Sequence, residues 1–364
     1  MKNNKPPYPI RLYWGENYAP KPPVVQKALK QAFQEALETV HWYPADTSVK
    51  LKNMIAKSYH LSFDQITVGN GIEGLLLPLF HAFVHHGDDV LVLEPTFSAY
   101  GANARVVGAK VIFIPVGLAT TLTATDVIAK MTKKTVMICL ASPNTSTGVY
   151  HISIKEIEKL AKQFHGNIVI DECYFGIGKH SAVPLLKKYS NIIVLQSASK
   201  VCGLAGLRIG WLMSSKPSIN VIEAQSIRLA TDPVSTASIL GLYSIWPYRT
   251  LLAKNYVAFQ KQFVKQLKHV AFFKVYPTHT TFIPVTFDTG KIPVKKFIQI
   301  MMKKYHIVLK DTSELGYLLV GVPPKNMWKY VIASFQQCIE SEFLASQACP
   351  PLPAGRQVWR GQTF

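Results

Sequence analysis

The chain has 364 residues, of which 48% are hydrophobic and 17% are charged, so a disordered chain is excluded and a globular protein with a large apolar core is indicated. Its 40 basic and 21 acidic residues give a net charge of +19, but the lysines are scattered, which favours anionic small molecules over specific binding of nucleic acid. The five cysteines fit free thiols rather than disulfides, and we expect no signal peptide, no membrane span and a cytoplasmic location.

The N-terminal part is expected to form an extended arm followed by two helices. Residues 1–23 are rich in proline, asparagine and lysine, which disfavours regular structure. Apolar residues recur at helical spacing over 24–39, and a second helix is predicted over 49–59, with a turn at 41–46 between them.

From residue 65 onward, short apolar strands alternate with helices. The strands are rich in β-branched residues and bounded by turn residues, and they are predicted at 66–68, 90–93, 110–115, 135–140, 168–171 and 192–196. This alternation predicts an α/β domain of three layers, in which a mostly parallel sheet is covered by helices.

The C-terminal part is predicted to be a small α+β domain. A helical region over 217–267 is followed by strands near 272–276, 281–287, 307–309 and 318–320, which alternate with two helices. We therefore expect an arm and helix over 1–40 that joins the small domain, a large domain over 41–250 and a small domain over 251–345. Residues 346–364 show no periodicity and are expected to be disordered.

A glycine-rich turn is the first candidate binding motif. Gly69-Asn70-Gly71-Ile72-Glu73-Gly74 follows a predicted strand and opens a helix, and amides at such a helix start bind phosphate well. The same residues match G-x-G-x-x-G, with Glu94 about twenty residues further on, as in a dinucleotide site. A nicotinamide-dependent dehydrogenase is therefore an alternative at this point.

An acid at the end of a buried strand is the second candidate. Asp171 ends an apolar strand and Tyr174 follows it; a buried aspartate needs a cationic or donor partner, such as a protonated pyridine nitrogen, a metal ion or a salt bridge. Phe97 could lie flat on a heterocycle or pack in the core. The loop at 142–148 follows another predicted strand, and its amides would point into a crevice at the carboxyl ends of the sheet.

The His-His-x-Asp-Asp run at 85–89 is a possible metal motif by composition. It lies in a solvated turn between a helix and a strand, so we expect no metal site there.

The third candidate is a lysine among small hydroxyl residues. Lys200 follows an apolar strand, lies beside Ser197 and Ser199, and precedes Arg208 by eight positions with glycines between. Two hydroxyls and a guanidinium suit a phosphate, and a lysine beside a phosphate-bearing aldehyde can form a Schiff base. A polar turn with a packed glycine-rich loop is the structural alternative.

In this order the motifs resemble the pyridoxal phosphate-dependent aminotransferases of fold type I, most closely histidinol-phosphate aminotransferases, over about residues 13–340. The most specific motif is Ser-Lys-x-x-Gly-Leu-Ala-Gly-Leu-Arg-x-Gly at 199–210. Further support comes from Gly-Asn-Gly at 69–71, Gly-Asp-x-Val at 87–90, Pro-Thr-Phe at 95–97 and Asp-Glu-x-Tyr at 171–174. The resemblance implies a three-layer large domain of fold type I, the cofactor pyridoxal phosphate, a homodimer and a role in histidine biosynthesis.

The resemblance also implies roles for single residues. Lys200 would form the Schiff base and move the proton, Asp171 would pair with the pyridine nitrogen, and Tyr174 would bond the ring hydroxyl. Phe97 would stack on the ring. The cofactor phosphate would be held by the amides of Gly71, Ile72 and Glu73, by Ser197, Ser199 and Arg208, and by Tyr43 of the second subunit.

Two departures from the family pattern bear on the site. The family's loop usually reads Pro-Asn-Asn-Pro-Thr-Gly, whereas this chain has Thr145 and Ser146 in place of the second asparagine and the second proline. The remaining contact to the ring hydroxyl then falls to Asn144 or Thr145, and we favour Asn144.

The second departure concerns the substrate side. Asn17 and Tyr18 belong to a segment that resembles the one that folds over the substrate, and Lys310 stands where an arginine is common. Tyr317 occupies the place of the arginine for a substrate carboxylate, and a tyrosine cannot form that bidentate pair.

We therefore expect a transaminase that acts on an amino acid or a phosphorylated amine. The alternatives are a pyridoxal phosphate-dependent decarboxylase of a phosphorylated amino acid, and a cofactor-binding protein without transaminase activity.

Overall fold

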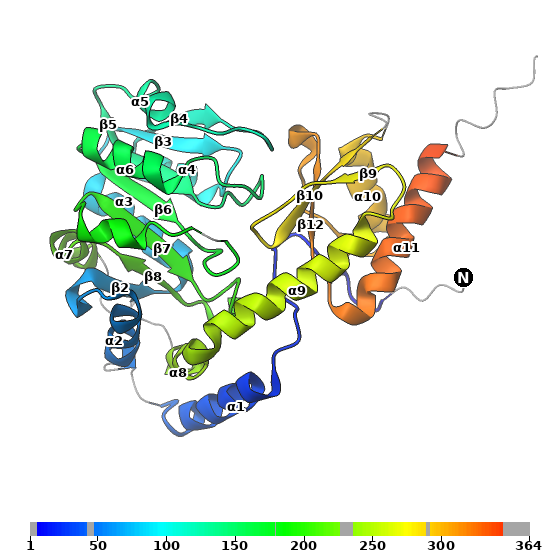
Figure 1. Cartoon of the computed structure of the whole chain (residues 1–364), viewed down its shortest axis with the longest axis horizontal. Coiled ribbons are helices and arrows are strands. Elements are labelled where there is room, and N and C mark those ends of the chain that lie inside the picture. Colours follow the sequence, from blue (N-terminus) through cyan, green and yellow to red (C-terminus); the bar gives the residue numbers. More distant parts are fainter. Residues whose placement is uncertain (1–5, 42–46, 179, 226–235, 289–291, 345–364) are drawn as a thin grey trace, which may run out of the picture.

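The computed structural model describes residues 6–41, 47–178, 180–225, 236–288 and 292–344, and it divides into a large and a small lobe (Figure 1). The large lobe is built around a seven-stranded sheet and the small lobe around a three-stranded one. The predicted tail at 346–364 and Tyr43 lie outside the described residues.

The large sheet has the strand order β2-β8-β7-β6-β5-β3-β4. Its strands are β2 (Ile66–Gly69), β3 (Asp89–Glu94), β4 (Lys110–Pro115), β5 (Thr135–Ala141), β6 (Asn167–Asp171), β7 (Ile192–Ser197) and β8 (Gly210–Met213). The neighbours from β4 to β7 are parallel, and β8 is antiparallel to both β7 and β2. The carboxyl ends of β3, β5, β6 and β7 therefore meet at one edge of the sheet.

Apart from the edge strand β4, the strands of this sheet are buried on both faces, which explains their nearly continuous apolar sequences. In β3, Leu91 and Leu93 point into one apolar cluster, and Val90 and Val92 point into another. The first cluster includes residues of α2 (Thr47–Tyr59) and α6 (Ile154–Gln163). The second includes residues of α3 (Gly71–Phe83), α4 (Ala99–Val106) and α7 (Lys216–Ala224). The predicted three-layer α/β architecture is confirmed.

The small lobe combines an antiparallel sheet with helices. Its sheet has the order β12-β10-β9, from β9 (Phe273–Val275), β10 (Phe282–Phe287) and β12 (Leu318–Gly321). Residues of α10 (Val294–Tyr305) and α11 (Trp328–Ile339) lie in its core. The long helix α9 (Arg249–Leu267) runs between the two lobes (Figure 1). The division of domains at residues 40, 250 and 345 stays a prediction.

The N-terminal segment joins the two lobes. Part of the predicted arm is a short strand, β1 (Ile10–Arg11), which pairs in parallel with β11 (Ile307–Val308). The Gly321 amide donates to the Leu12 carbonyl, which fixes the same segment against the small sheet. Further on, α1 (Pro23–Glu38) packs against α8 (Thr236–Ile245). The remaining helix, α5 (Ala124–Ile128), follows β4.

Candidate active site

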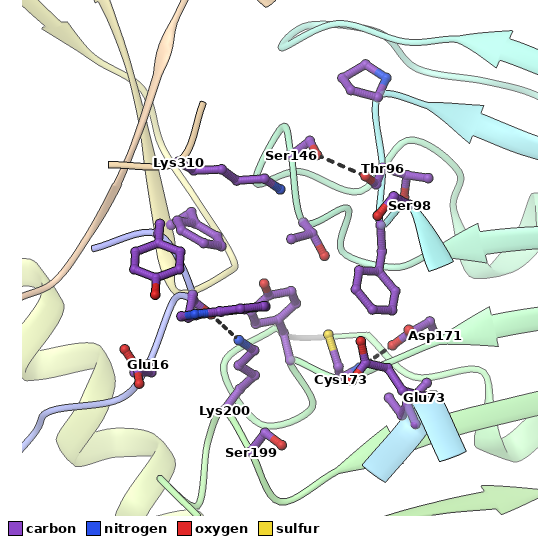
Figure 2. Close-up of a pocket in the computed structure, with 18 of the residues that line it drawn as sticks. Glu16, Glu73, Thr96, Ser98, Ser146, Asp171, Cys173, Ser199, Lys200 and Lys310 are labelled. Atoms are coloured by element: carbon purple, nitrogen blue, oxygen red, sulfur yellow. Dashed lines mark hydrogen bonds between the residues drawn. The ribbon is translucent and has the colours of Figure 1, made fainter. Parts of the chain in front are cut away.

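A cavity of about 840 Å³ lies at the carboxyl edge of the large sheet. The ends of β3, β6 and β7, the start of α3, the N-terminal segment and residues 310–315 all line it. Figure 2 shows Lys200 and Lys310 reaching into this space from opposite sides. The cavity volume suits a small molecule, and its position is the expected one for a ligand site in an open α/β sheet.

Asp171 lies at the base of the cavity, where β6 ends. Its side chain is 3% exposed and accepts hydrogen bonds from the Tyr100 hydroxyl and, at 2.8 Å, from the Cys173 amide. Burial raises the pKa of this carboxyl, while the two hydrogen bonds and the Lys200 amine act in the opposite direction. A carboxylate with these donors can accept one more proton-bearing partner from the cavity.

Lys200 reaches the same cavity from the loop after β7. Its Nζ donates to the carbonyl oxygens of Trp14 at 2.6 Å and Gly15 at 3.3 Å (Figure 2). Burial lowers the pKa of this amine, although Cys173 and Glu16 oppose the shift. The amine is therefore easier to deprotonate than an exposed lysine, which a nucleophile and proton carrier requires.

The opposite end of the cavity is built to bind an anion. Ile72 and Glu73 open α3, whose N-terminal residue Asn70 gives no side-chain cap. A Cβ on Gly71 would lie 2.8 Å from Nη2 of Arg208, so only glycine lets the guanidinium lie over this helix start. The free amides and the guanidinium together form a site for a phosphate group.

Two serine hydroxyls complete this anion site. Ser197 donates from Oγ to Oγ of Ser199 at 2.8 Å, and the Ser199 amide donates back to Ser197 at 3.0 Å. Both serines line the cavity with Arg208. The predicted phosphate residues of this chain therefore meet in one place, apart from Tyr43, which lies outside the described residues.

The structure separates the two candidates for the ring-hydroxyl contact. Asn144 is fully buried; its amide donates to the Pro95 carbonyl at 3.0 Å, and its oxygen accepts from the amides of Ser146 and Thr147. It is not among the residues that line the cavity, whereas Thr145 is. Asn144 uses its polar atoms to close the loop, so of the two candidates Thr145 is the better placed for this contact, which stays a prediction.

Tyr174 places a buried hydroxyl at the cavity, with the side chains of Thr145 and Thr281 as neighbours. Its ring is completely buried, and neither its hydroxyl nor Oγ1 of Thr281 makes a hydrogen bond of good geometry to a described residue. Burial raises the pKa of Tyr174 well above its usual value, so the group stays protonated. Buried polar atoms without partners are costly, and a phenolic oxygen of a ligand would satisfy this hydroxyl.

Phe97 is held in place by a residue that the sequence reasoning missed. The ring of Tyr100 meets that of Phe97 edge to face, with 5.6 Å between the centroids, and Tyr100 also donates to Asp171. The three-residue spacing of Phe97 and Tyr100 is a weak signal by itself. Tyr100 thus positions two predicted cofactor contacts at once. These are Asp171, expected to pair with the pyridine nitrogen, and Phe97, expected to stack on the same ring.

Two residues of the N-terminal segment make their contacts outside the cavity. Asn17 donates to the carbonyls of Lys200 at 2.9 Å and Val201 at 3.1 Å, and Tyr18 donates to Glu16 at 2.8 Å. Neither Asn17 nor Tyr18 lines the cavity. In the structure Asn17 ties the segment to the lysine loop and Tyr18 orients Glu16, while their predicted contact with substrate stays a prediction.

The two predicted substrate residues of the small lobe also separate. Lys310 lines the cavity, 5.8 Å above the centre of the Phe282 ring, and burial lowers the pKa of its amine. Tyr317 is 7% exposed and donates to the carbonyl of Ser146 at 2.9 Å, which joins the small lobe to the loop after β5. Its hydroxyl is directed at the main chain, so the structure does not support its predicted contact with substrate, which stays untested.

The residues present fit pyridoxal phosphate at each of its polar groups. The start of α3 with Arg208 suits the phosphate, Lys200 suits the aldehyde, and Asp171 suits a protonated pyridine nitrogen. The buried hydroxyl of Tyr174 suits the ring hydroxyl. Within the described part of the chain, no group of three or more histidine, cysteine or acidic residues is placed to hold a metal ion.

Comparison with known proteins agrees with this site. The sequence model of the family described as aminotransferase class I and II matches residues 9–325. A histidinol-phosphate aminotransferase of Sinorhizobium fredii is 29% identical over 330 residues, which are 90% of this chain and 88% of that protein. One of Thermoanaerobacter pseudethanolicus is 30% identical over 290 residues, which are 77% of this chain and 79% of that protein.

A solved structure shares the fold. The histidinol-phosphate aminotransferase of Sinorhizobium meliloti, determined in complex with pyridoxal-5'-phosphate, has a TM-score of 0.79 at 18% identity. The match covers 92% of this chain and 91% of that one. The predicted fold type I architecture is confirmed by this likeness.

Proposed function

This chain belongs to the class I and II aminotransferases and is a pyridoxal phosphate-dependent transaminase; we propose that the amine it transaminates, in either direction of the reaction, is a phosphorylated amine such as histidinol phosphate. We further propose that it acts in histidine biosynthesis, in the cytoplasm and as a homodimer. Among the described helices, none is both long and apolar enough to cross a bilayer. The curated relatives named above are both histidinol-phosphate aminotransferases, which supports this choice of donor.

The assignment as a transaminase is supported mainly by one observation: Lys200 and Asp171 line the same cavity, beside an anion site. When bound, pyridoxal phosphate supplies an aldehyde for amino groups and an electron-withdrawing ring. Asp171 would hold the ring nitrogen protonated, and Tyr174 would donate to the ring oxygen. The Lys200 amine, whose pKa is lowered by burial, would take and return the proton at the substrate carbon.

The choice of donor depends on the cations that face the substrate. Among the described residues that line the cavity, Arg11 pairs with Glu16 and Arg208 pairs with Glu73, whereas Lys310 has no ion pair. Lys310 is half-buried and interacts with Glu94 without forming an ion pair, so an anionic group on the ligand would stabilise its charge. Lys310 is a point charge rather than a fork, which suits a phosphate better than the planar pairing of a carboxylate.

The position of Tyr317 gives the same preference. Its hydroxyl is used by the Ser146 carbonyl, so the position where the family carries an arginine offers no cation here. We therefore expect glutamate to be a weak donor and a phosphorylated amine without a carboxylate to be a strong one. Since the relatives named are aminotransferases, a decarboxylase and a non-catalytic cofactor-binding protein are not favoured.

A donor panel tests this proposal. The purified protein, loaded with pyridoxal phosphate, is mixed with histidinol phosphate, histidinol or glutamate, and the visible absorbance of the bound cofactor is followed. We expect histidinol phosphate to convert the cofactor to its amine form fastest, with a carbonyl product and no carbon dioxide. Release of carbon dioxide from a phosphorylated amino acid, or conversion only by glutamate, would contradict the proposal.

Replacing Lys310 tests the phosphate contact. Lys310→Gln should raise KM for histidinol phosphate about 10-fold, in the range of one charge-assisted contact, and leave KM for histidinol nearly unchanged. Lys188→Gln is the matched control, because Lys188 lies on the surface, where it pairs with Glu158. An equal rise of KM for both donors would remove Lys310 from phosphate recognition. Sedimentation of the loaded protein would test the homodimer.

A further inference from the structure

Arg208 and Glu73 form an ion pair inside the predicted phosphate site. Nη2 of Arg208 donates to Oε2 of Glu73 at 3.1 Å. Both side chains line the cavity and are about half exposed, with 44% of the arginine and 57% of the glutamate accessible. A carboxylate therefore lies where the cofactor phosphate is expected to bind.

Glu73 is well placed to serve as an anion for this site. It is in the first turn of α3, a helix of 13 residues whose N-terminus has no side-chain cap. A negative charge there interacts favourably with the helix dipole and with the uncapped amides. The carboxylate thus compensates the same two positive features, the guanidinium and the helix start, that a phosphate would use.

We propose that Glu73 competes with the cofactor phosphate for Arg208. The carboxylate of Glu73 must leave the guanidinium before the phosphate group can bind there. This inference rests on the proposed function, in that it takes the start of α3 and Arg208 as the phosphate site. Cofactor binding would then exchange one anion for another at Arg208. The half-exposed glutamate can turn to solvent, so it delays and weakens binding without blocking it.

The size of the effect follows from the exposure of the pair. A half-exposed ion pair stabilises a protein by at most about 1 kcal/mol. The phosphate loses this amount of binding free energy when it displaces Glu73 from Arg208. Removing the charge of Glu73 should therefore tighten the binding of a phosphate-bearing ligand by about 2- to 5-fold. The change should be seen in equilibrium affinity without any turnover of substrate.

The test compares Glu73→Gln with the parent chain using two probes. Binding of pyridoxal phosphate is measured by tryptophan fluorescence in a Lys200→Ala background, so that no covalent bond to the lysine contributes. Trp14 lines the cavity at 57% exposure and provides the signal. Binding of inorganic phosphate is measured by thermal shift with Lys200 intact, which covers the case in which the double variant does not fold.

Glu314→Gln is the matched control, since Glu314 lines the same cavity and has no ion pair among the described residues. We expect both probes to bind about 2- to 5-fold more tightly to Glu73→Gln, and to bind Glu314→Gln as tightly as the parent. In an Arg208→Gln background, Glu73→Gln should give little gain, because the guanidinium for which the anions compete is missing.

The outcomes separate this inference from the proposed function. If Glu73→Gln binds pyridoxal phosphate with the affinity of the parent, the competition is refuted and the proposed function stands. A gain of the same size in Glu314→Gln, or in the Arg208→Gln background, would also refute it, since either shows a general charge effect. If neither probe binds any of the proteins, the phosphate site and the proposed function both fail.

Discussion

Replacing Tyr100 by phenylalanine isolates the hydrogen bond that holds Asp171. The tyrosine is 1% exposed, and its hydroxyl donates to Oδ2 of Asp171, while its ring packs against Phe97. Phenylalanine keeps the packing and removes only the hydroxyl. Asp171 keeps the Cys173 amide as a donor in the variant, so the carboxyl stays in place with one partner fewer.

The direction of the pKa change is fixed by the environment. Burial raises the pKa of Asp171, and the bond from Tyr100 is the largest influence that lowers it. Without that bond the carboxyl becomes protonated at a higher pH. A buried hydrogen bond to a charged group contributes about 1.5–3 kcal/mol, so its loss should raise the pKa of Asp171 further.

The pH profile of activity measures this shift. Since the ionised carboxylate is needed to hold the ring nitrogen protonated, we expect the acid limb of kcat/KM to move to higher pH in Tyr100→Phe. Tyr330→Phe is the control, because it removes a hydroxyl bond to the Tyr305 carbonyl in the small lobe. An unmoved acid limb in Tyr100→Phe, with the cofactor still bound, would refute the role of this bond.

Three further predictions concern the loop after β5, the contact between the lobes and a second buried acid. Thr145→Ala should weaken pyridoxal phosphate binding about 3- to 10-fold, as measured by cofactor titration, and leave the free energy of unfolding unchanged. Asn144→Ala should lower the free energy of unfolding by about 2–3 kcal/mol, as measured by denaturant titration, because it removes the bonds that close the loop. Tyr317→Phe removes the bond to Ser146 and should cost about 0.5–1.5 kcal/mol of unfolding free energy without changing KM; a raised KM would restore Tyr317 to the substrate site. Burial raises the pKa of Glu172 to about 7, so between its unfolded pKa and pH 7 the folded chain holds a proton that the unfolded chain has lost. Stability should therefore fall as pH rises through this window, and Glu172→Gln should flatten the slope; an equal slope in both proteins would contradict the assignment.

Features written in contiguous sequence were predicted well. The strand that ends at Asp171 and the strand before Lys200 are short, apolar and β-branched, and their functional side chains follow at the carboxyl ends. Parallel pairing then brings these ends together, because β6 and β7 are neighbours in the sheet. Local pattern and parallel topology were therefore enough to predict that the carboxylate and the lysine share one crevice.

Features that depend on distant contacts were not predicted. The partners of Asn17 are 183 and 184 residues away, and that of Tyr317 is 171 residues away, so no local pattern could identify them. The short strand β1 is defined only by its pairing with β11. The loop-closing role of Asn144 had a local signal, because an asparagine side chain often bonds amides two or three residues on.

The strand β8 was overlooked for another reason. Residues 210–213 directly follow the glycine-rich loop after Lys200. The small residues of that loop gave no sign that a strand begins where it ends. Its antiparallel pairing with β7 places Gly210 opposite Ser197. The glycine-rich motif therefore encodes both the loop around the lysine and the return strand that supports it.

The most direct test of the account is to locate the covalent attachment of the cofactor. The protein is incubated with pyridoxal phosphate, reduced with borohydride, digested and mapped by mass spectrometry. The account predicts the cofactor adduct on Lys200, and its loss in Lys200→Ala. An adduct on Lys310 with Lys200 unmodified, or no adduct at all, would contradict the assignment of Lys200 as the Schiff-base lysine.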